Sequence, residues 1–178
     1  MTNNKTSEQH IFKITDKNEE RVLREKTKPF DFSKFSKKEI SDLLLRMKKE
    51  MRNARGIGLS ANQIGLRFSV FVAEVPIENS GIKFYAVFNP KIEKLFGETS
   101  FMEEGCLSIP SLYGNVERPS RITISGFDKS GKELKIKAWG LLARVFQHEI
   151  DHLNGKLFID RTKNIYSPEE RQVKLNRR

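Results

Sequence analysis

The sequence predicts an α+β fold in which antiparallel β-sheets pack around a central α-helix, with an N-terminal helix and a short C-terminal helix. Three observations predict this class. Residues 140–153 have the apolar spacing of a buried helix, and Asn154 and Gly155 follow as a stop signal. Four alternating or β-branched runs precede this helix in the sequence. A short turn joins two of these runs, which makes them antiparallel neighbours.

Length and composition favour a single globular domain. A chain of 178 residues is long enough for one sizeable core and too short for two ordinary domains. We expect a catalytic domain at 21–161, a flexible arm at 1–20 and a basic tail at 162–178. No apolar run approaches the ~18 residues of a membrane span, and the polar start does not resemble a signal peptide, so we expect a cytoplasmic protein without a membrane partner. The lone Cys106 excludes an internal disulfide.

The first well-marked element is a helix at 36–55. Ser36 and Glu39 have the spacing of a capping box, and apolar side chains then follow the 3.6-residue period from Ile40 to Met51. Gly56 is expected to end the helix as its C-cap. These signals make this helix the N-terminal helix of the fold.

The strand predictions fall at 66–75, 83–89, 121–127 and 133–138. Residues 128–131, Asp-Lys-Ser-Gly, read as the turn of a hairpin between the last two. Ser167, Pro168 and two glutamates predict the start of a last, basic helix.

The predicted central helix carries two of the three histidines, His148 and His152, on either side of Glu149. Residues four apart share one helical face, so both imidazoles can reach one divalent ion while Glu149 borders its open coordination position. A purely structural helix is the competing interpretation, but it would leave imidazole and carboxylate groups buried without partners. The pattern therefore favours a catalytic metal site.

Such a site needs a third protein ligand. One class of metalloproteases places a third histidine three residues beyond the glycine, but Phe158 stands there. The remaining donors are His10, in the expected arm, and Cys106, in the Gly- and Pro-bounded segment 103–110. A thiolate is a strong ligand for borderline or soft divalent ions, which favours Cys106. Its competing role is that of a small buried hydrophobe.

A glycine-rich segment at 56–65 leaves the first helix and enters the first strand. It contains no lysine and lacks the spacing of a phosphate-binding loop, which excludes nucleotide binding. The side-chain amide of Gln63 could donate a hydrogen bond to an oxyanion, or it could serve only the structure of the loop.

These segments together resemble the motifs of the peptide deformylase family. Gly-Ile-Gly-Leu-Ser-Ala-Asn-Gln begins at Gly56, Glu-Gly-Cys-Leu-Ser begins at Glu104, and Gln-His-Glu-Ile-Asp-His-Leu-Asn-Gly begins at Gln147. The three stand in the order of the family, and the similarity covers residues 20–161. Ser60 stands where the family more often has alanine.

The resemblance implies a metal-dependent hydrolase that removes the formyl group from the N-terminal formylmethionine of nascent polypeptides. It implies one divalent ion held by Cys106, His148 and His152. Bacterial members most often use Fe²⁺, and Zn²⁺, Ni²⁺ or Co²⁺ can occupy the same ligands. A bacterial-type cytoplasmic protein is expected, with an organellar or phage source left open.

The resemblance also implies three catalytic roles. Glu149 takes a proton from water and passes it to the leaving amine. The side-chain amide of Gln63 and the backbone N–H of Leu107 stabilise the oxyanion, together with the ion.

The family's pattern places the substrate as an added strand beside a pocket for the methionine side chain. The candidate substrate-binding residues are Ile57, Gly58, Met102, Gly105, Leu141 and Val145. Each apolar residue among them could instead be part of the core.

Two further features concern arginines. Glu104 and Arg118 resemble the family's supporting ion pair, which would hold the Cys106 segment. Arg144 lies one helical turn before His148, where many relatives carry an aliphatic residue. It either pairs with a nearby carboxylate or reshapes the rim of the pocket.

The net charge of +10 raises the possibility of a polyanionic partner. From Arg161 to Arg178 there are six Arg or Lys and two Glu, which gives a net charge of +4. This favours weak, salt-sensitive contact with the ribosome through the tail over specific reading of DNA. Two alternatives to a deformylase are a metallopeptidase or amidase with another substrate, and a non-catalytic ribosome-binding protein of the same fold.

Overall fold

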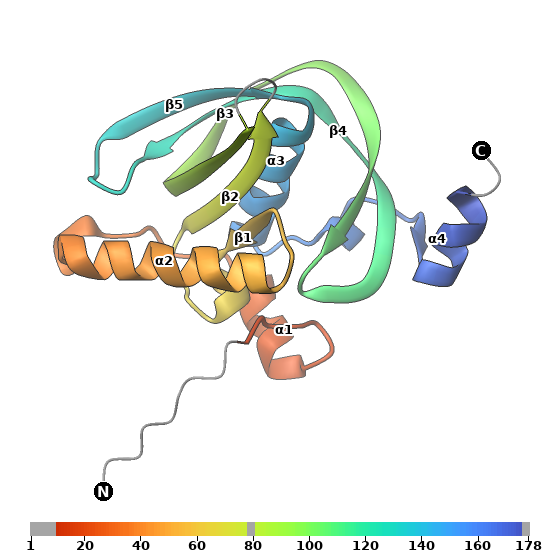
Figure 1. Cartoon of the computed structure of the whole chain (residues 1–178), viewed down its shortest axis with the longest axis horizontal. Coiled ribbons are helices and arrows are strands. Elements are labelled where there is room, and N and C mark those ends of the chain that lie inside the picture. The colour runs from red at the N-terminus through yellow and green to blue at the C-terminus, as the bar shows by residue number, and fades with distance from the viewer. Residues whose placement is uncertain (1–9, 78–80, 176–178) are drawn as a thin grey trace, which may run out of the picture.

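The computed structural model describes residues 10–77 and 81–175 (Figure 1). The α-helices are α1 (Lys17–Arg24), α2 (Lys37–Asn53), α3 (Gly140–Leu153) and α4 (Pro168–Leu175). The strands are β1 (Gly58–Ser60), β2 (Val70–Ile77), β3 (Gly81–Cys106), β4 (Ile109–Phe127), β5 (Glu133–Trp139) and β6 (Ile165–Tyr166). Short 3-10 helices are η1 (Phe32–Lys34), η2 (Ala61–Ile64) and η3 (Phe158–Asp160). The predicted α+β class is confirmed.

The strands form an antiparallel sheet in the order β1-β2-β3-β4-β5, and β6 pairs with β4. β3 and β4 are the longest strands and run beside each other from Phe88 and Phe127 to Cys106 and Ile109. Because β4 follows β3 after a tight turn, the residues after Cys106 are held at the end of this long ladder. The predicted turn at 128–131 is present, with Asp128 N donating to Lys132 O at 2.9 Å.

Two of the predicted strands extend well beyond their expected bounds. The runs at 83–89 and 121–127 are parts of β3 and β4, and the structure continues each strand across prolines and glycines. Register shifts interrupt the β3–β4 ladder near Asn89 and near Gly97, and each of these two residues has a positive φ angle. β-Bulges of this kind let a ladder continue past residues that would otherwise end it. The predicted strand at 66–75 begins later, at Val70.

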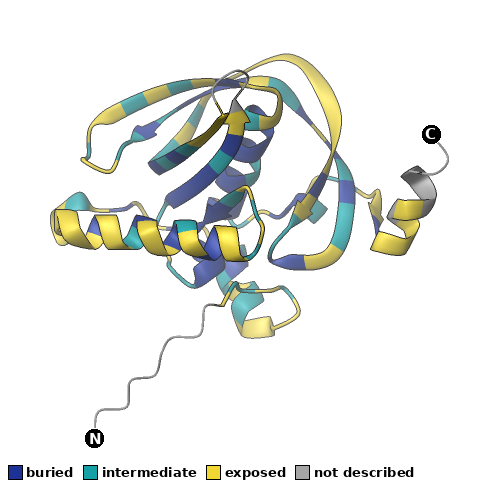
Figure 2. Ribbon diagram, viewed as in Figure 1, coloured by how far each residue is buried: buried dark blue, intermediate teal, exposed yellow. Residues whose placement is uncertain are grey.

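The central helix α3 has the predicted bounds and lies inside the curve of the sheet (Figure 1). Its apolar side chains pack against β2, β4 and β5 in one core cluster that includes Phe71, Ile124 and Phe146. Figure 2 shows α3 as mostly buried. Since α3 is largely covered from Ala143 onward, its polar side chains must find partners inside the protein.

Helix α2 begins at the predicted capping box. Ser36 Oγ accepts from Glu39 N, and Glu39 Oε2 accepts from Ser36 N at 2.7 Å. Figure 2 shows its outer face exposed and its inner face buried. The expected C-cap at Gly56 was wrong, because Ala54 caps the helix and Arg55 takes the left-handed conformation, φ +57°. Gly56 instead allows close packing, since a Cβ there would lie 2.7 Å from Leu107 Cδ1.

A flexible arm was expected at 1–20, but residues 10–20, the part that the structure describes, are ordered by contacts with the domain. Residues 1–9 lie outside the described part. Phe12 N donates to Gln63 O at 2.7 Å and Ile14 N donates to Ser108 O at 3.1 Å. The Asp16 side chain then caps α1. Backbone pairing and a side-chain cap thus order residues that composition alone marks as polar and loose.

Helix α4 begins where the sequence predicted, with Ser167 N donating to Glu170 Oε2 at 2.9 Å. It lies at the edge of the molecule, away from α2 (Figure 1). Among the described residues, no helix has both the length and the apolar character needed to cross a membrane.

Candidate active site

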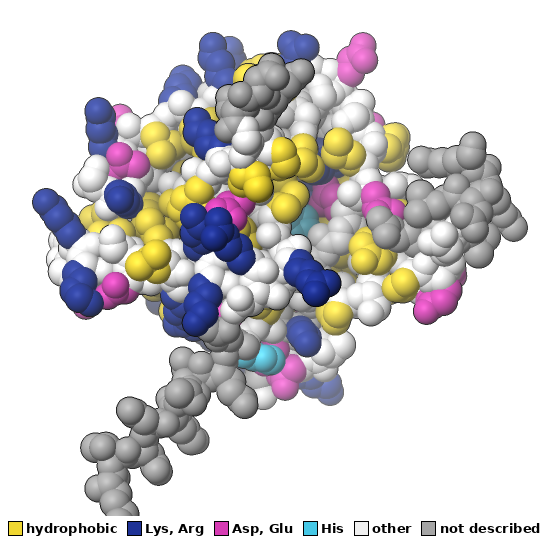
Figure 3. Space-filling view, viewed as in Figure 1, with side chains coloured by type: hydrophobic (Ala, Val, Ile, Leu, Met, Phe, Trp, Pro, Cys, Tyr) yellow, Lys and Arg dark blue, Asp and Glu magenta, His cyan; other side chains and the backbone are white. Residues whose placement is uncertain are grey.

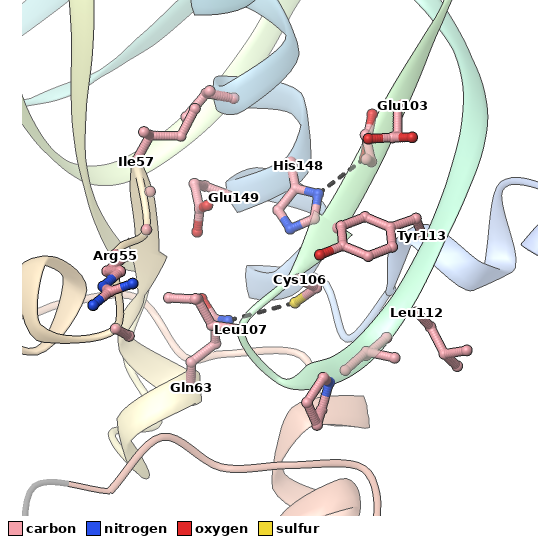
Figure 4. Close-up of a pocket in the computed structure, with 18 of the residues that line it drawn as sticks. Arg55, Ile57, Gln63, Glu103, Cys106, Leu107, Leu112, Tyr113, His148 and Glu149 are labelled. Carbon is pink, nitrogen blue, oxygen red and sulfur yellow. Dashed lines mark hydrogen bonds and ion pairs between the residues drawn. The ribbon is translucent and has the colours of Figure 1, made fainter. Parts of the chain in front are cut away.

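A cavity of about 500 Å³ opens between β1, α3 and the turn that joins β3 to β4. In the space-filling view, hydrophobic side chains gather along one rim of a hollow in which a histidine is visible (Figure 3). Figure 4 shows His148, Glu149 and Cys106 grouped in the cavity, with Ile57 and Arg55 on one side and Tyr113 on the other. The cavity therefore contains the polar residues that the sequence singled out.

The three candidate metal ligands meet at the wall of this cavity, which Cys106 and His148 line. The donor atoms of Cys106, His148 and His152 all lie within 4.8 Å of one another. Cys106 Sγ lies 3.1 Å from His152 Nε2, close to the spacing of about 3.5 Å expected for sulfur and nitrogen donors of one tetrahedral ion. One sulfur and two imidazole nitrogens suit Fe²⁺, Zn²⁺, Ni²⁺ or Co²⁺. The donor set and its spacing therefore fit one divalent ion.

The other two residues that entered the search for a third ligand lie elsewhere. His10 pairs with Glu19 at the N-terminal end of the described chain. Phe158 is 1% exposed and belongs to a small core cluster beneath the Cys106 turn.

The outer nitrogen of His148 is held by a carboxylate. His148 Nδ1 lies 2.9 Å from Glu104 Oε2, and Arg118 donates to both oxygens of Glu104 at 2.7 and 3.0 Å. Burial alone would raise the pKa of Glu104, but the hydrogen bonds from His148 and Arg118 lower it far below its usual value. An ionised Glu104 fixes the ring so that its other nitrogen faces the cavity.

This network continues to a residue that the sequence did not identify. Arg118 NH1 donates to Asp151 Oδ2 at 2.6 Å, and Arg161 Nε donates to the same oxygen at 3.0 Å. Asp151 lies between the two histidines in the sequence but points away from the cavity. Only the three-dimensional position of Arg118 shows its purpose.

Arg144 pairs with a carboxylate, which answers one of the two expectations for it. NH1 donates to Glu104 Oε1 at 3.0 Å and to Val116 O at 2.8 Å, while NH2 donates to Ser100 O at 2.7 Å. The side chain therefore ties α3 to both long strands. It also lines the cavity, so the second expectation, an effect on the rim, agrees with its position.

Glu149 is 3% exposed and lies against β1. Ser60 Oγ donates to Glu149 Oε2 at 2.7 Å and also to Glu149 O at 2.9 Å. A Cβ on Gly58 would lie 2.3 Å from Glu149 Oε1, so only glycine leaves room for this carboxyl group. Burial raises the pKa of Glu149 above its usual value, although His148 and His152 act against it.

Gln63 lies on η2 with both ends of its amide engaged. Gln63 Oε1 accepts from Ser60 N at 2.9 Å, and Nε2 donates to Ser108 Oγ at 3.1 Å. Nε2 also lies 3.7 Å from Cys106 Sγ. The carbonyl end is thus fixed by β1, and the N–H₂ end faces the candidate ligands. Leu107, the other expected donor, lines the same cavity.

The sulfur of Cys106 is held ready to ionise. Burial would raise the pKa of Cys106, but the charges and hydrogen bonds of His152 and His148 lower it to about 5. Ser108 N also donates to the sulfur at 3.4 Å. A thiolate is the form of cysteine that binds metal.

Five of the six candidate substrate-binding residues line the cavity: Ile57, Gly58, Gly105, Leu141 and Val145. Met102 is not among the lining residues; it lies on β3 and is 37% exposed. Arg55, Leu112 and Tyr113 line the cavity without having been predicted. They come from a helix end and a strand whose course past the turn was not evident from the sequence.

The fold and this arrangement define an enzyme of the hydrolase class. A buried carboxyl group and a set of metal-binding donors face one cavity, as hydrolysis by an activated water requires. The chain belongs to the polypeptide deformylase family, whose family model matches residues 9–167.

Curated relatives and solved structures agree with this membership. The chain is 44% identical over 144 residues to a peptide deformylase of Halothermothrix orenii, covering 81% of this chain and 89% of the relative. It is 47% identical over 127 residues to a peptide deformylase of Prochlorococcus marinus, covering 71% of this chain and 63% of the relative.

Two solved structures extend the comparison to the fold. A probable peptide deformylase from Synechococcus phage S-SSM7 has a TM-score of 0.76 and 41% identity, covering 85% of this chain and 98% of that one. A peptide deformylase from Synechococcus elongatus in complex with actinonin has a TM-score of 0.78 and 36% identity, covering 94% and 85%. At these identities the likeness extends beyond the fold to the sequence.

Proposed function

We propose that the protein removes the formyl group from the N-terminal formylmethionine of nascent polypeptides and releases formate. One observation carries the proposal. Cys106, His148, Glu149 and Gln63 line a single cavity, and the donor atoms of Cys106 and His148 lie within 4.8 Å of that of the buried His152, in a chain of the polypeptide deformylase family. The first three would hold a divalent ion, for which we propose Fe²⁺. When bound, such an ion acts as a Lewis acid that makes water nucleophilic near neutral pH.

The native ion has its own test. Fe²⁺ and the Cys106 thiolate are both open to oxidation, so activity of the iron form should decay in air. Metal analysis of anaerobically purified protein should find about one iron per chain. Activity that is stable in air, with zinc as the bound metal, would contradict the assignment of iron.

Glu149 serves as the general base and acid. Its carboxyl group is buried beside both imidazoles, and burial raises its pKa toward the range in which a group can both take and return a proton. Ser60 holds one oxygen at 2.7 Å and orients the group. Glu149 takes a proton from the attacking water and delivers it to the nitrogen of the leaving amine.

Gln63 and Leu107 stabilise the oxyanion. As water adds to the formyl carbon, negative charge grows on the formyl oxygen. The Gln63 N–H₂ group is fixed in direction by the bond from Ser60 N to its carbonyl end. Leu107 lines the same cavity, and its backbone N–H is the second donor that we propose. Each such donor contributes about 2.7–4 kcal/mol to lowering the barrier.

The nascent chain binds as an added strand. β1 is the first strand of the sheet order, and among the described residues it pairs with β2 alone, so its other edge is available for backbone hydrogen bonds to a peptide. Ile57, Leu141 and Val145 present apolar surface to the methionine side chain. Ile57 and Leu141 are 44% and 41% exposed, which leaves apolar area for a substrate to cover.

A substrate comparison tests the activity. The protein should release formate from a formyl-Met-Ala-Ser peptide and leave the same peptide uncut when it is unformylated. An acetyl-Met-Ala-Ser peptide serves as the matched control, because it keeps the amide and adds one methyl group. Cleavage of the unformylated peptide would support the metallopeptidase alternative instead.

We also propose that the basic tail contacts the ribosome in the cytoplasm, where nascent chains emerge. Residues 161–178 have a net charge of +4, from six Arg or Lys and two Glu. Deletion of 167–178 should weaken ribosome binding and reduce its salt dependence without changing the rate on free peptides. Unchanged, salt-insensitive affinity would remove the idea.

A further inference from the structure

The two candidate histidine ligands differ in how their outer nitrogens are held. His148 Nδ1 lies 2.9 Å from Glu104. His152 Nδ1 is buried, and in the described ranges 10–77 and 81–175 no group lies within hydrogen-bonding distance of it. A metal-ligating imidazole almost always donates its second N–H to an acceptor. A buried N–H without an acceptor would be costly.

Asn62 contacts the backbone of His152. It sits on η2, is 1% exposed, and its Nδ2 donates to His152 O at 2.7 Å. Asn62 Oδ1 is the other buried side-chain atom without a hydrogen-bond partner in the part of the chain that the structure describes. Asn62 thus has a buried acceptor oxygen without a partner among the described residues, and His152, to which it is bonded, has a buried ring nitrogen without one.

There is also space for water beside Asn62. Asn62 lines a second cavity of about 100 Å³, which shares no lining residue with the active-site cavity. Thr27 and Arg67 line it as well. A buried water is stable where it has two or more polar partners and enough space.

We propose that Asn62 is a positioning residue for His152, acting through two bonds. Its Nδ2 fixes the His152 carbonyl, and its Oδ1 shares one buried water with His152 Nδ1. This arrangement keeps the proton on Nδ1 and points Nε2 toward Cys106. The inference rests on the proposed role of His152 as a metal ligand.

The first test compares two variants at the same cavity. Asn62→Leu removes both bonds and keeps the number and branching of the side-chain heavy atoms. Thr27→Val is the matched control, because Thr27 lines the same cavity and its hydroxyl donates to the neighbouring Leu153 O at 2.9 Å. In zinc-loaded protein, Asn62→Leu should raise the metal dissociation constant by about 10–100-fold. Thr27→Val should leave it within about twofold, since the Thr27 hydroxyl bonds to Leu153 and not to His152.

A second readout separates positioning from a general structural effect. In the NMR spectrum of the zinc-loaded wild type, His148 and His152 should each show a protected Nδ1–H signal. Asn62→Leu should lose the His152 signal and keep the His148 signal as an internal reference. Asn62→Asp keeps an acceptor oxygen, so it should retain the His152 signal even if Asn62→Leu fails to fold.

Three outcomes would overturn the inference: a dissociation constant for Asn62→Leu within twofold of wild type, a His152 signal that persists in Asn62→Leu, or its loss in Asn62→Asp. Failure of the wild type to bind zinc through Cys106, His148 and His152 would instead contradict the proposed function. The two failures are therefore distinguishable.

Discussion

Gln63 illustrates how a single side chain is prepared for catalysis by the bonds around it. Its carbonyl end accepts from Ser60 N, which leaves the N–H₂ end to face Ser108 and the Cys106 sulfur. The amide cannot rotate without losing the bond from β1. A donor that is fixed before the reaction costs little reorganisation when charge develops.

Replacing this amide should affect turnover more than metal binding. We expect Gln63→Leu to lower kcat by about 10²–10³-fold, because one oxyanion donor is lost. Metal content should stay at the wild-type level, since Gln63 is not one of the three donors. Kinetics and metal analysis on the same sample check both statements. Parallel loss of metal and activity would show that Gln63 serves only the structure of the site.

The residues that sequence could predict are those with distinctive chemistry at fixed spacing. His148, Glu149 and His152 share one helix, so their relation follows from the period. Cys106 was then predicted as the third metal ligand, because the other strong ligand, His10, lies in the expected arm. The hydrogen bond from Ser60 to Glu149 could not be predicted, because it depends on how closely β1 approaches α3, and no local sequence pattern encodes that approach.

At the scale of elements, α3 depends on how it ends. Gly155 takes φ +71° after the C-cap Asn154, and a Cβ there would lie 2.2 Å from Arg24 O. The end of the metal-site helix is thus pressed against the end of α1. Any side chain at this position must displace the backbone of another element.

Gly155→Ala should therefore destabilise the protein strongly. Gly81→Ala is the matched control, since Gly81 has the same φ of +71° but no atom of the described residues lies within 4 Å of an added Cβ. The control should cost about 1 kcal/mol for the left-handed conformation alone. Gly155→Ala should cost about 2–3 kcal/mol more, the range of overpacking. Urea unfolding of both variants checks this, and equal losses would show that the close approach does not matter.

The helices were predictable to within a few residues because their signals are local. The capping box fixes the start of α2, and Asn154 with Gly155 fixes the end of α3. The strands were less predictable, since β3 and β4 continue through bulges at Asn89 and Gly97. Whether a proline or glycine ends a strand depends on its neighbour in the sheet, and that neighbour is distant in the sequence.

At the scale of the whole molecule, a chain of charges, buried at Glu104, Arg118 and Asp151 and exposed at Arg161, links the active-site helix to the sheet and the C-terminal segment. Asp151 lies between Arg118 and Arg161, and Arg118 continues to Glu104. Burial would raise the pKa of Asp151, but the hydrogen bond from Arg161 and the charge of Arg118 lower it below its usual value. The folded state therefore binds the Asp151 proton less tightly than the unfolded state.

This shift predicts how stability depends on pH. A lowered carboxyl pKa contributes stability above the unfolded value of about 3.9, and that contribution is lost as pH falls through the lower folded value. Asp151→Asn should cost about 3 kcal/mol at pH 7, as for a broken buried pair. The difference from wild type should shrink below about pH 4. Urea unfolding between pH 7 and pH 2.5 measures it, and a difference that stays constant would contradict the shift.

The overall class was predictable because it depends on the kinds and order of elements. One central helix and hairpin-linked strands already specify an α+β fold. The path of the long β3–β4 ladder was not predictable, because it depends on pairing between residues that are distant in the sequence, such as Phe88 and Phe127. That ladder brings the Cys106 turn to α3, so the complete site is a property of the folded molecule.

The central claim is that Glu149 drives formyl hydrolysis beside a metal held by Cys106, His148 and His152. The most direct test is formate release from formyl-Met-Ala-Ser under anaerobic conditions, by wild type and Glu149→Ala loaded with one equivalent of Fe²⁺. We predict turnover by the wild type and a loss of about 10²–10⁴-fold in kcat for Glu149→Ala, at equal metal content. No formate from metal-loaded wild type, or full activity of Glu149→Ala, would contradict the claim.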